Sequence, residues 1–77
     1  MRKLEFLSEL EDLMELAPKT LNDESVLTEF SNWDSMMILG FIVMAEQKLG
    51  YVVEGKTVGK ANTVQDLFNI VKDYLQD

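Results

Sequence analysis

Apolar residues recur at helical spacing in the first segment of the chain. Most of them lie three, four or seven positions apart, so they form one stripe, and acidic residues fall on the opposite side. The stripe consists of Phe6, Leu7, Leu10, Leu13, Met14 and Ala17, and the acidic residues are Glu5, Glu9, Asp12 and Glu15. Pro18 cannot continue a helix because its ring removes an N–H donor and disfavours helical geometry in the preceding residue. We therefore expect an amphipathic first helix that ends near Leu16.

The segment from Ser35 to Leu49 is apolar on nearly all sides. This pattern is typical of a helix that contacts neighbours on more than one side. Gly50 follows it and is suited to a C-terminal cap, because glycine adopts the left-handed conformation without penalty. The deeper stripe of this second helix is expected to be Ile38, Phe41, Ile42, Ala45 and Leu49.

The last third of the chain has a helix-start signature at Thr63, with an acidic side chain at Asp66 three residues later. Apolar residues then repeat at helical spacing, at Val64, Leu67, Phe68, Val71 and Leu75. These residues predict a final helix. Between Gly50 and Thr63 the turn-rich sequence allows one short helix near Thr57 to Ala61.

Residues 17–34 form a connection longer than the usual 4 to 6 residues or so, and long loops in compact domains are usually functional. Apolar residues should anchor it to the core, with a helical turn around Asp23 to Leu27; these anchors are Leu21, Val26, Leu27, Phe30 and Trp33. The fold class predicted for residues 1–77 is a single all-α domain: a small antiparallel bundle of three main helices and one short helix, with a long ordered first loop.

The chain has no cysteine and no histidine. Disulfides, thiolate metal sites and nucleophilic systems that need histidine are therefore excluded, and we expect no enzyme activity and no metal site.

The net charge of −7 disfavours nucleic acid and anionic membranes and favours basic partners. The apolar run from Met36 to Ala45 is too short to span a bilayer, and Glu5 and Glu9 interrupt any signal-peptide core. A soluble, cytoplasmic and monomeric protein is expected.

Ser35 stands where a polar, turn-rich stretch changes to the apolar second helix. A serine at a helix start has an exposed hydroxyl beside unpaired N–H groups and the positive end of the helix dipole, which would favour a phosphate esterified there. The simpler interpretation is that Asp34 and Ser35 only cap the helix, as Asp and Ser commonly do.

A partner that reaches Ser35 would also meet residues on the same side of the helix. These lie four, eight and eleven positions further on, at Leu39, Val43 and Glu46. Met36 and Met37 flank this strip, as core residues or as an adaptable contact surface. A glycine inside a helix costs about 1 kcal/mol relative to alanine, so Gly40 suggests a packing or contact requirement.

The sequence Glu29-Phe30-Ser31-Asn32-Trp33-Asp34-Ser35-Met36, followed by an apolar helix, Gly50 and Thr63-Val64-Gln65-Asp66-Leu67, resembles the acyl carrier proteins of the phosphopantetheine-dependent family. The resemblance covers almost the whole chain, including the long first loop and the helix order. The family motif is Asp-Ser-Leu, and Met36 replaces its leucine with a side chain of similar volume.

The resemblance implies that Ser35 receives 4′-phosphopantetheine from coenzyme A, in a reaction catalysed by a separate magnesium-dependent phosphopantetheinyl transferase. The arm ends in a thiol that would hold acyl groups as thioesters for acyl-activating, acyl-transferring or condensing enzymes. Asp34 corresponds to the family's acidic residue that engages the transferase. Partner contacts are implied for Met36, Met37, Leu39, Gly40, Val43, Glu46 and Gln47.

The chain departs from the family in its charge distribution. Housekeeping fatty-acid carriers resemble one another in a strongly acidic second helix, whereas here Ser35 to Leu49 contains only Glu46, offset by Lys48. Residues 1–34 hold nine acidic and three basic residues, and residues 35–77 hold five acidic and four basic ones. Because rim charges select partners, we expect a specialised carrier, in a fatty-acid or polyketide type of biosynthesis, that docks more through apolar contacts.

Alternatives remain within and outside the family. The Asp-Ser-Met motif also resembles D-alanyl carriers and aminoacyl or peptidyl carriers. Outside the family, the chain could be an unmodified helical module that binds a protein partner through the apolar second helix. A calcium sensor is disfavoured because no twelve-residue stretch has the spacing of an EF-hand loop.

Overall fold

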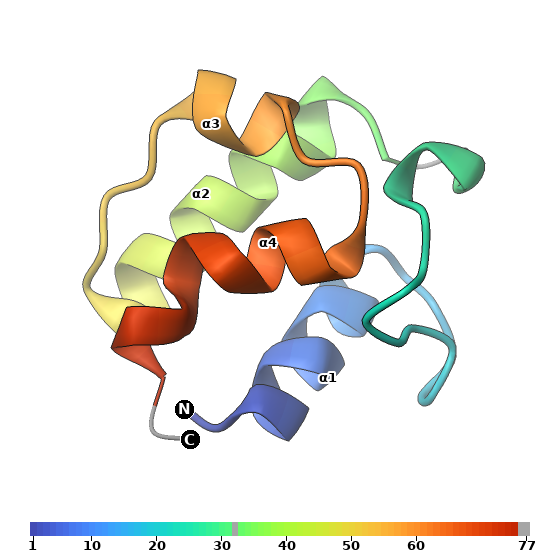
Figure 1. The fold of residues 1–77 in the computed structure, drawn as a ribbon, viewed down its shortest axis with the longest axis horizontal. Coiled ribbons are helices and arrows are strands. Elements are labelled where there is room, and N and C mark those ends of the chain that lie inside the picture. The colour runs from blue at the N-terminus through green and yellow to red at the C-terminus, as the bar shows by residue number, and fades with distance from the viewer. Residues whose placement is uncertain (32, 76–77) are drawn as a thin grey trace.

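The computed structural model describes residues 1–31 and 33–75. These residues form four α-helices and two short 3-10 helices, and the described part of the chain contains no β-strand. Figure 1 shows the helices arranged around a common centre, with the long first loop on the side of α1 and α4. The bounds are α1 Lys3–Leu13, η1 Leu27–Glu29, α2 Ser35–Leu49, α3 Gly55–Gly59, α4 Val64–Val71 and η2 Lys72–Tyr74. The all-α prediction is confirmed.

Helix α2 has the bounds that the sequence predicts, because both of its ends have strong local signals. Asp34 is the N-cap, and its carboxylate accepts a hydrogen bond from the Met37 backbone N–H at 3.1 Å. Gly50 ends the helix in the left-handed conformation, with φ of 68°.

The start of α4 is also confirmed as a capping box. The Thr63 hydroxyl accepts a hydrogen bond from the Asp66 N–H at 3.2 Å, and the Asp66 carboxylate accepts one from the Thr63 N–H at 3.1 Å. The carboxylate accepts a second hydrogen bond, from the Asn62 N–H at 2.9 Å. These backbone donors, at Asn62 and then Thr63, lower the pKa of Asp66.

Helix α1 ends at Leu13, three residues before the expected end, so that prediction was wrong. The reason is Glu15, which adopts the left-handed conformation with φ of 58°. Around it the Leu16 N–H bonds the Glu11 carbonyl at 2.8 Å and the Glu15 N–H bonds the Asp12 carbonyl at 3.1 Å. This is the Schellman pattern, which closes a helix with a left-handed residue that is usually glycine. The helix therefore ends before Pro18 has any effect.

The core is built from one buried face of each helix. Phe6 lies at its centre, with its ring edge-on to Phe41 at 6.2 Å between ring centroids and tilted against Phe68 at 6.3 Å. From α1 the buried apolar residues are Phe6, Leu10 and Met14; from α2 they are Phe41, Met44 and Ala45; from α4 they are Val64, Leu67 and Val71. The predicted stripes are therefore partly wrong. Ala17 is exposed, Leu13 is half-buried, and Ile38, Ile42 and Leu49 pack at the edge of the core.

The long first loop is held against the start of α4. Val26 and Thr63 form an isolated antiparallel bridge, in which the Leu27 N–H bonds the Asn62 carbonyl at 2.8 Å and the Val64 N–H bonds the Ser25 carbonyl at 3.0 Å. Leu21 and Leu27 are buried, as predicted for anchors.

Two local details of the connections differ from the prediction. The helical turn of the first loop was expected around Asp23 to Leu27 but is found as η1, Leu27–Glu29. The short helix α3, Gly55–Gly59, begins two residues before the expected segment. Both errors arise in turn-rich segments where tertiary contacts decide the backbone and local sequence signals are weak.

Candidate functional site

Ser35 is the first residue of α2 and is exposed. Asp34, the residue before it, provides the cap, and within the described residues the Ser35 hydroxyl has no hydrogen-bond partner. The first backbone N–H groups of a helix have no carbonyl acceptor within the helix, so the positive end of α2 lies at this hydroxyl. Among the described residues, capping therefore accounts for Asp34 but gives no role to the Ser35 hydroxyl.

The chain has no histidine that could act as a base at Ser35, and the nearest carboxylate in sequence, Asp34, accepts the capping hydrogen bond. Among residues 1–31 and 33–75, no group of three or more acidic side chains is arranged to hold a metal ion.

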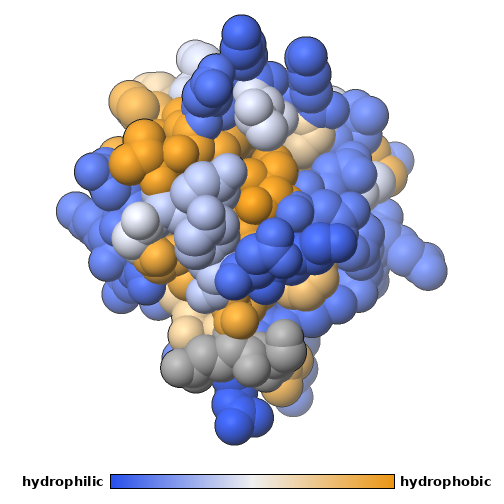
Figure 2. All heavy atoms as spheres, turned by 60° about the vertical axis from the view of Figure 1, so that its left-hand side comes forward, coloured by the Kyte–Doolittle hydropathy of each residue, from blue (hydrophilic) through white to orange (hydrophobic). Residues whose placement is uncertain are grey.

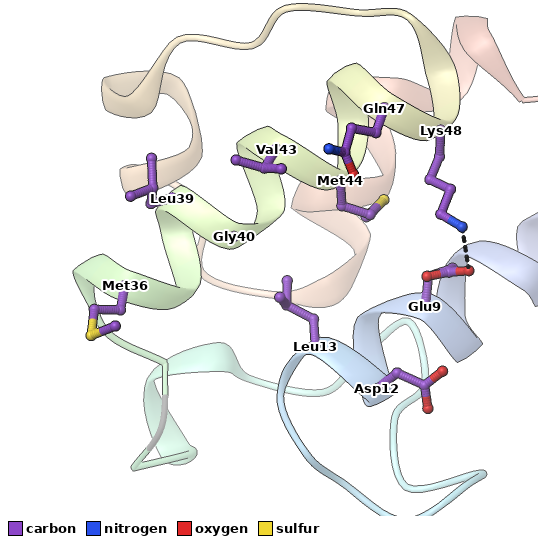
Figure 3. A pocket seen from close by; sticks show the side chains of 10 residues that line it. All are labelled: Glu9, Asp12, Leu13, Met36, Leu39, Gly40, Val43, Met44, Gln47 and Lys48. Atoms are coloured by element: carbon purple, nitrogen blue, oxygen red, sulfur yellow. Dashed lines mark ion pairs between the residues drawn. The ribbon is translucent and has the colours of Figure 1, made fainter.

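A shallow groove of about 590 Å³ lies beside Ser35, between α1 and α2. Figure 3 shows that α2 forms one wall and α1 the other. The α2 residues are Met36, Leu39, Gly40, Val43, Met44, Gln47 and Lys48, and the α1 residues are Glu9, Asp12 and Leu13. Three of the apolar side chains are strongly exposed: Met36 is 73% exposed, Leu39 61% and Val43 42%. Met36, which lines one end of the groove, directly follows Ser35 in the chain.

Gly40 lies on the α2 wall of this groove, directly against the Leu13 side chain of α1. A β-carbon at this position would come within 2.7 Å of the Leu13 Cδ1 atom. In Figure 3 the Leu13 side chain points from α1 towards α2 at Gly40. The glycine that the sequence analysis singled out thus has a packing reason, and its missing side chain also leaves the groove open.

The structure brings together most of the partner-contact residues implied by the family resemblance. Five of them line the groove: Met36, Leu39, Gly40, Val43 and Gln47. Met37 is half-buried and packs against the core, whereas Met36 is exposed. The sequence alone could not show which of the two methionines is buried. Glu46 is exposed but does not line the groove, and Asp34 lies at the cap beside Ser35.

Sequence reasoning missed the contribution of α1 to this surface. Glu9 and Asp12 appeared only as the solvent side of an amphipathic helix, and Leu13 as a core residue. The one signal that pointed to a second wall was Gly40, because a glycine inside a helix is typical of close packing against another element.

Two acidic side chains and one basic side chain line the groove: Glu9, Asp12 and Lys48. Lys48 of α2 forms an ion pair with Glu9 of α1, with 3.6 Å between Nζ and Oε1 (Figure 3). Asp12 is exposed and, within residues 1–31 and 33–75, takes part in no ion pair. Among the described residues, the groove-lining carboxylate that takes part in no ion pair therefore belongs to α1.

Exposed apolar atoms are not confined to the groove. Figure 2, which brings forward the side of α3 and of the connection after α2, shows several apolar areas between polar side chains. Val52 and Tyr74 are exposed, and the Tyr74 ring stacks on Tyr51 at 4.2 Å. The groove differs from these areas because it adjoins Ser35. None of the helices in the described part is both long enough and apolar enough to cross a bilayer.

Comparison of the chain with models of protein families, with curated proteins and with solved structures gives no match.

Proposed function

We propose that this chain is an acyl carrier protein in which Ser35 bears 4′-phosphopantetheine. The observation that carries the proposal is the exposed Ser35 hydroxyl at the start of α2, left free because Asp34 is the cap. A phosphodiester at this oxygen would lie at the positive end of the helix, which favours negative charge. On this proposal the four helices form the antiparallel bundle of the carrier family.

The composition supports the same function. A chain without cysteine has no thiol of its own, so thioester chemistry would require a cofactor that supplies one. Phosphopantetheine provides such a thiol on a flexible arm. In the attachment reaction the Ser35 oxygen would form a bond to the phosphorus next to the pantetheine arm, and its proton would go to a base of the transferase. The P–O bond within the diphosphate of coenzyme A would break, and the nucleotide part would leave with the bridging oxygen.

The site suggests which parts of the chemistry this chain would contribute and which its partner enzymes would contribute. Since no histidine is present and Asp34 is engaged in the cap, the chain itself contributes the hydroxyl, the helix terminus and a docking surface. The transferase would supply the metal and the base, and acyl-activating, acyl-transferring or condensing enzymes would act on the cargo. We propose that the protein is a cytoplasmic monomer that serves a specialised biosynthetic pathway, because α2 contains Glu46 as its single acidic residue.

The cargo alternatives stay open: the same site would suit a D-alanyl, aminoacyl or peptidyl carrier. The competing function of another class is an unmodified helical module that binds a protein through the exposed side chains of Met36, Leu39 and Val43. This alternative gives no role to the free Ser35 hydroxyl.

The test is incubation of the purified protein with coenzyme A, Mg²⁺ and a promiscuous phosphopantetheinyl transferase, followed by intact mass spectrometry. The wild type should gain one phosphopantetheine group and Ser35→Ala none. Ser31→Ala is the matched control, since Ser31 is an exposed serine outside the helix and its replacement should leave the modification intact. An unmodified wild type would favour the interaction module.

A further inference from the structure

We propose that Met36 is a site of reversible oxidation, at which hydrogen peroxide converts the thioether to a sulfoxide and thereby slows the attachment of a group to Ser35. Met36 directly follows Ser35 at the start of α2. Oxidation of the sulfur does not depend on what Ser35 carries, but the effect on attachment rests on the proposed function.

Exposure separates Met36 from the other methionines of the chain. Met36 is 73% exposed, whereas Met14 is fully buried and Met44 is 8% exposed. Met1 and Met37 are half-buried and pack against the core. Peroxide must reach the sulfur atom to react with it, so the most exposed methionine is expected to react first.

The position of the Met36 sulfur also makes it accessible. Figure 3 shows the Met36 side chain at the end of the groove nearest the start of α2, with its sulfur on the side away from Leu13 and Met44. The chain has no cysteine that would compete for peroxide as a thiolate. Met36 is therefore the most accessible sulfur that the protein offers before any group is attached.

The reaction transfers one oxygen atom to the side chain. A lone pair of the Met36 sulfur attacks an oxygen of hydrogen peroxide, an S–O bond forms, the O–O bond breaks, and the second oxygen leaves as water. The sulfur loses two electrons and the peroxide gains them. The product is a polar, chiral sulfoxide, which methionine sulfoxide reductases convert back to the thioether at the expense of a thiol reductant.

The sulfoxide would form beside the hydroxyl that the carrier function requires. Ser35 and Met36 are the first two residues of α2, so an enzyme that reaches the Ser35 oxygen also covers the neighbouring side chain. Before oxidation that side chain is apolar, like the exposed side chains of Leu39 and Val43. Covering a sulfoxide oxygen without giving it a hydrogen-bond donor carries a desolvation penalty. Oxidation therefore slows a step in which an enzyme closes over Ser35.

The fold itself should tolerate this oxidation. Met36 lies outside the buried core, whereas Met14 and Met44 belong to it, and a polar oxygen on either of those would disrupt the packing. Leucine, which the family motif has at this position, has no sulfur to oxidise. Methionine at position 36 therefore adds a reactivity that leucine lacks, at a place where the product does not disturb the core.

The first experiment maps the oxidation. The purified protein, before any group is attached, is treated with hydrogen peroxide for increasing times and digested with trypsin. Tandem mass spectrometry of the peptide from Thr20 to Lys48, which contains Met36, Met37 and Met44, gives the rate at each sulfur. Met36 should gain one oxygen roughly tenfold faster than the other two, in line with its exposure. Circular dichroism should show unchanged helix content at that stage.

The second experiment measures the initial rate of attachment with coenzyme A, Mg²⁺ and the transferase after the peroxide is removed. Oxidised wild type should react roughly tenfold more slowly than untreated wild type, and methionine sulfoxide reductase with dithiothreitol should restore the rate. Met36→Leu should have the same rate before and after peroxide treatment, and Met37→Leu, the matched control, should slow as the wild type does. Met36→Gln, whose amide is polar like a sulfoxide, should be slow without peroxide.

The outcomes separate the oxidation of Met36 from its effect at Ser35. If Met37 or Met44 is oxidised as fast as Met36, the assignment of the oxidation site is wrong. If Met36 is oxidised first but the attachment rate does not change, or if Met36→Leu slows as much as the wild type, the effect at Ser35 is wrong and the carrier proposal stands. If untreated wild type accepts no group, the proposed function is wrong, and the effect on attachment is wrong with it.

Discussion

The Leu13 Cδ1 atom occupies the space that a side chain at Gly40 would need, with 2.7 Å to an ideal β-carbon. Real β-carbons are almost never in such close contact, so one of the two residues would have to move. The far end of Leu13 faces the groove, so its side chain has room to rotate outwards. A side chain at position 40 therefore requires displacement of Leu13 into the groove.

This relationship predicts a coupled effect in a double-mutant cycle. Gly40→Ala alone should change the free energy of unfolding by less than about 1 kcal/mol, because the gain in helix propensity is offset by displacement of Leu13. In a Leu13→Ala background the same substitution should stabilise the protein by about 0.5–1 kcal/mol, since the obstructing methyl is gone. Urea unfolding of the four proteins measures the coupling, and additive effects would contradict the contact.

The buried position of Glu11 predicts that its replacement lowers the stability of the fold, which the sequence pattern does not suggest. It is 6% exposed, and its Oε2 atom accepts a hydrogen bond from the Leu21 N–H at 2.9 Å. Glu11→Ala should cost about 1–3 kcal/mol of unfolding free energy, because the buried N–H loses its acceptor. Glu11→Gln keeps an acceptor oxygen and should cost less. Equal losses for the two variants would show that the hydrogen bond contributes little.

The capping box of α4 predicts a pH dependence of stability. The pKa of Asp66 is lowered from its ordinary value of 3.8, so between the folded and unfolded pKa values the unfolded chain binds more protons. The stabilisation is therefore complete above the ordinary value and is lost as the pH falls through the folded pKa. In urea unfolding from pH 6 to pH 2.5, the wild type should lose more stability on acidification than Asp66→Asn. Parallel curves for the two proteins would contradict this.

The sequence predicted elements well where a single residue type decides the local geometry. Asp34 and Gly50 mark both ends of α2, and the reciprocal hydrogen bonds of Thr63 and Asp66 mark the start of α4. It failed at the end of α1 because Glu15, a residue type that rarely takes the left-handed conformation, does so here. Nothing in the local pattern identifies that residue.

The candidate site could be predicted only in part for a related reason. Ser35 and the α2 wall follow from one helix and its start, which are local properties. The α1 wall depends on how two helices pack, and residues that look like an ordinary solvent face, such as Asp12, become part of a site only through that packing. Glu11 was missed in the same way, since a helical period assigns it to the exposed side although the first loop folds over it.

The identity of the residue that bears the added group tests the central claim most directly. After reaction with coenzyme A, Mg²⁺ and the transferase, tandem mass spectrometry of the tryptic peptide from Thr20 to Lys48 distinguishes its hydroxyl residues, which are Thr20, Ser25, Thr28, Ser31 and Ser35. The account predicts a single phosphopantetheine group on Ser35. An unmodified peptide, or a group on any of the other four residues, would contradict it.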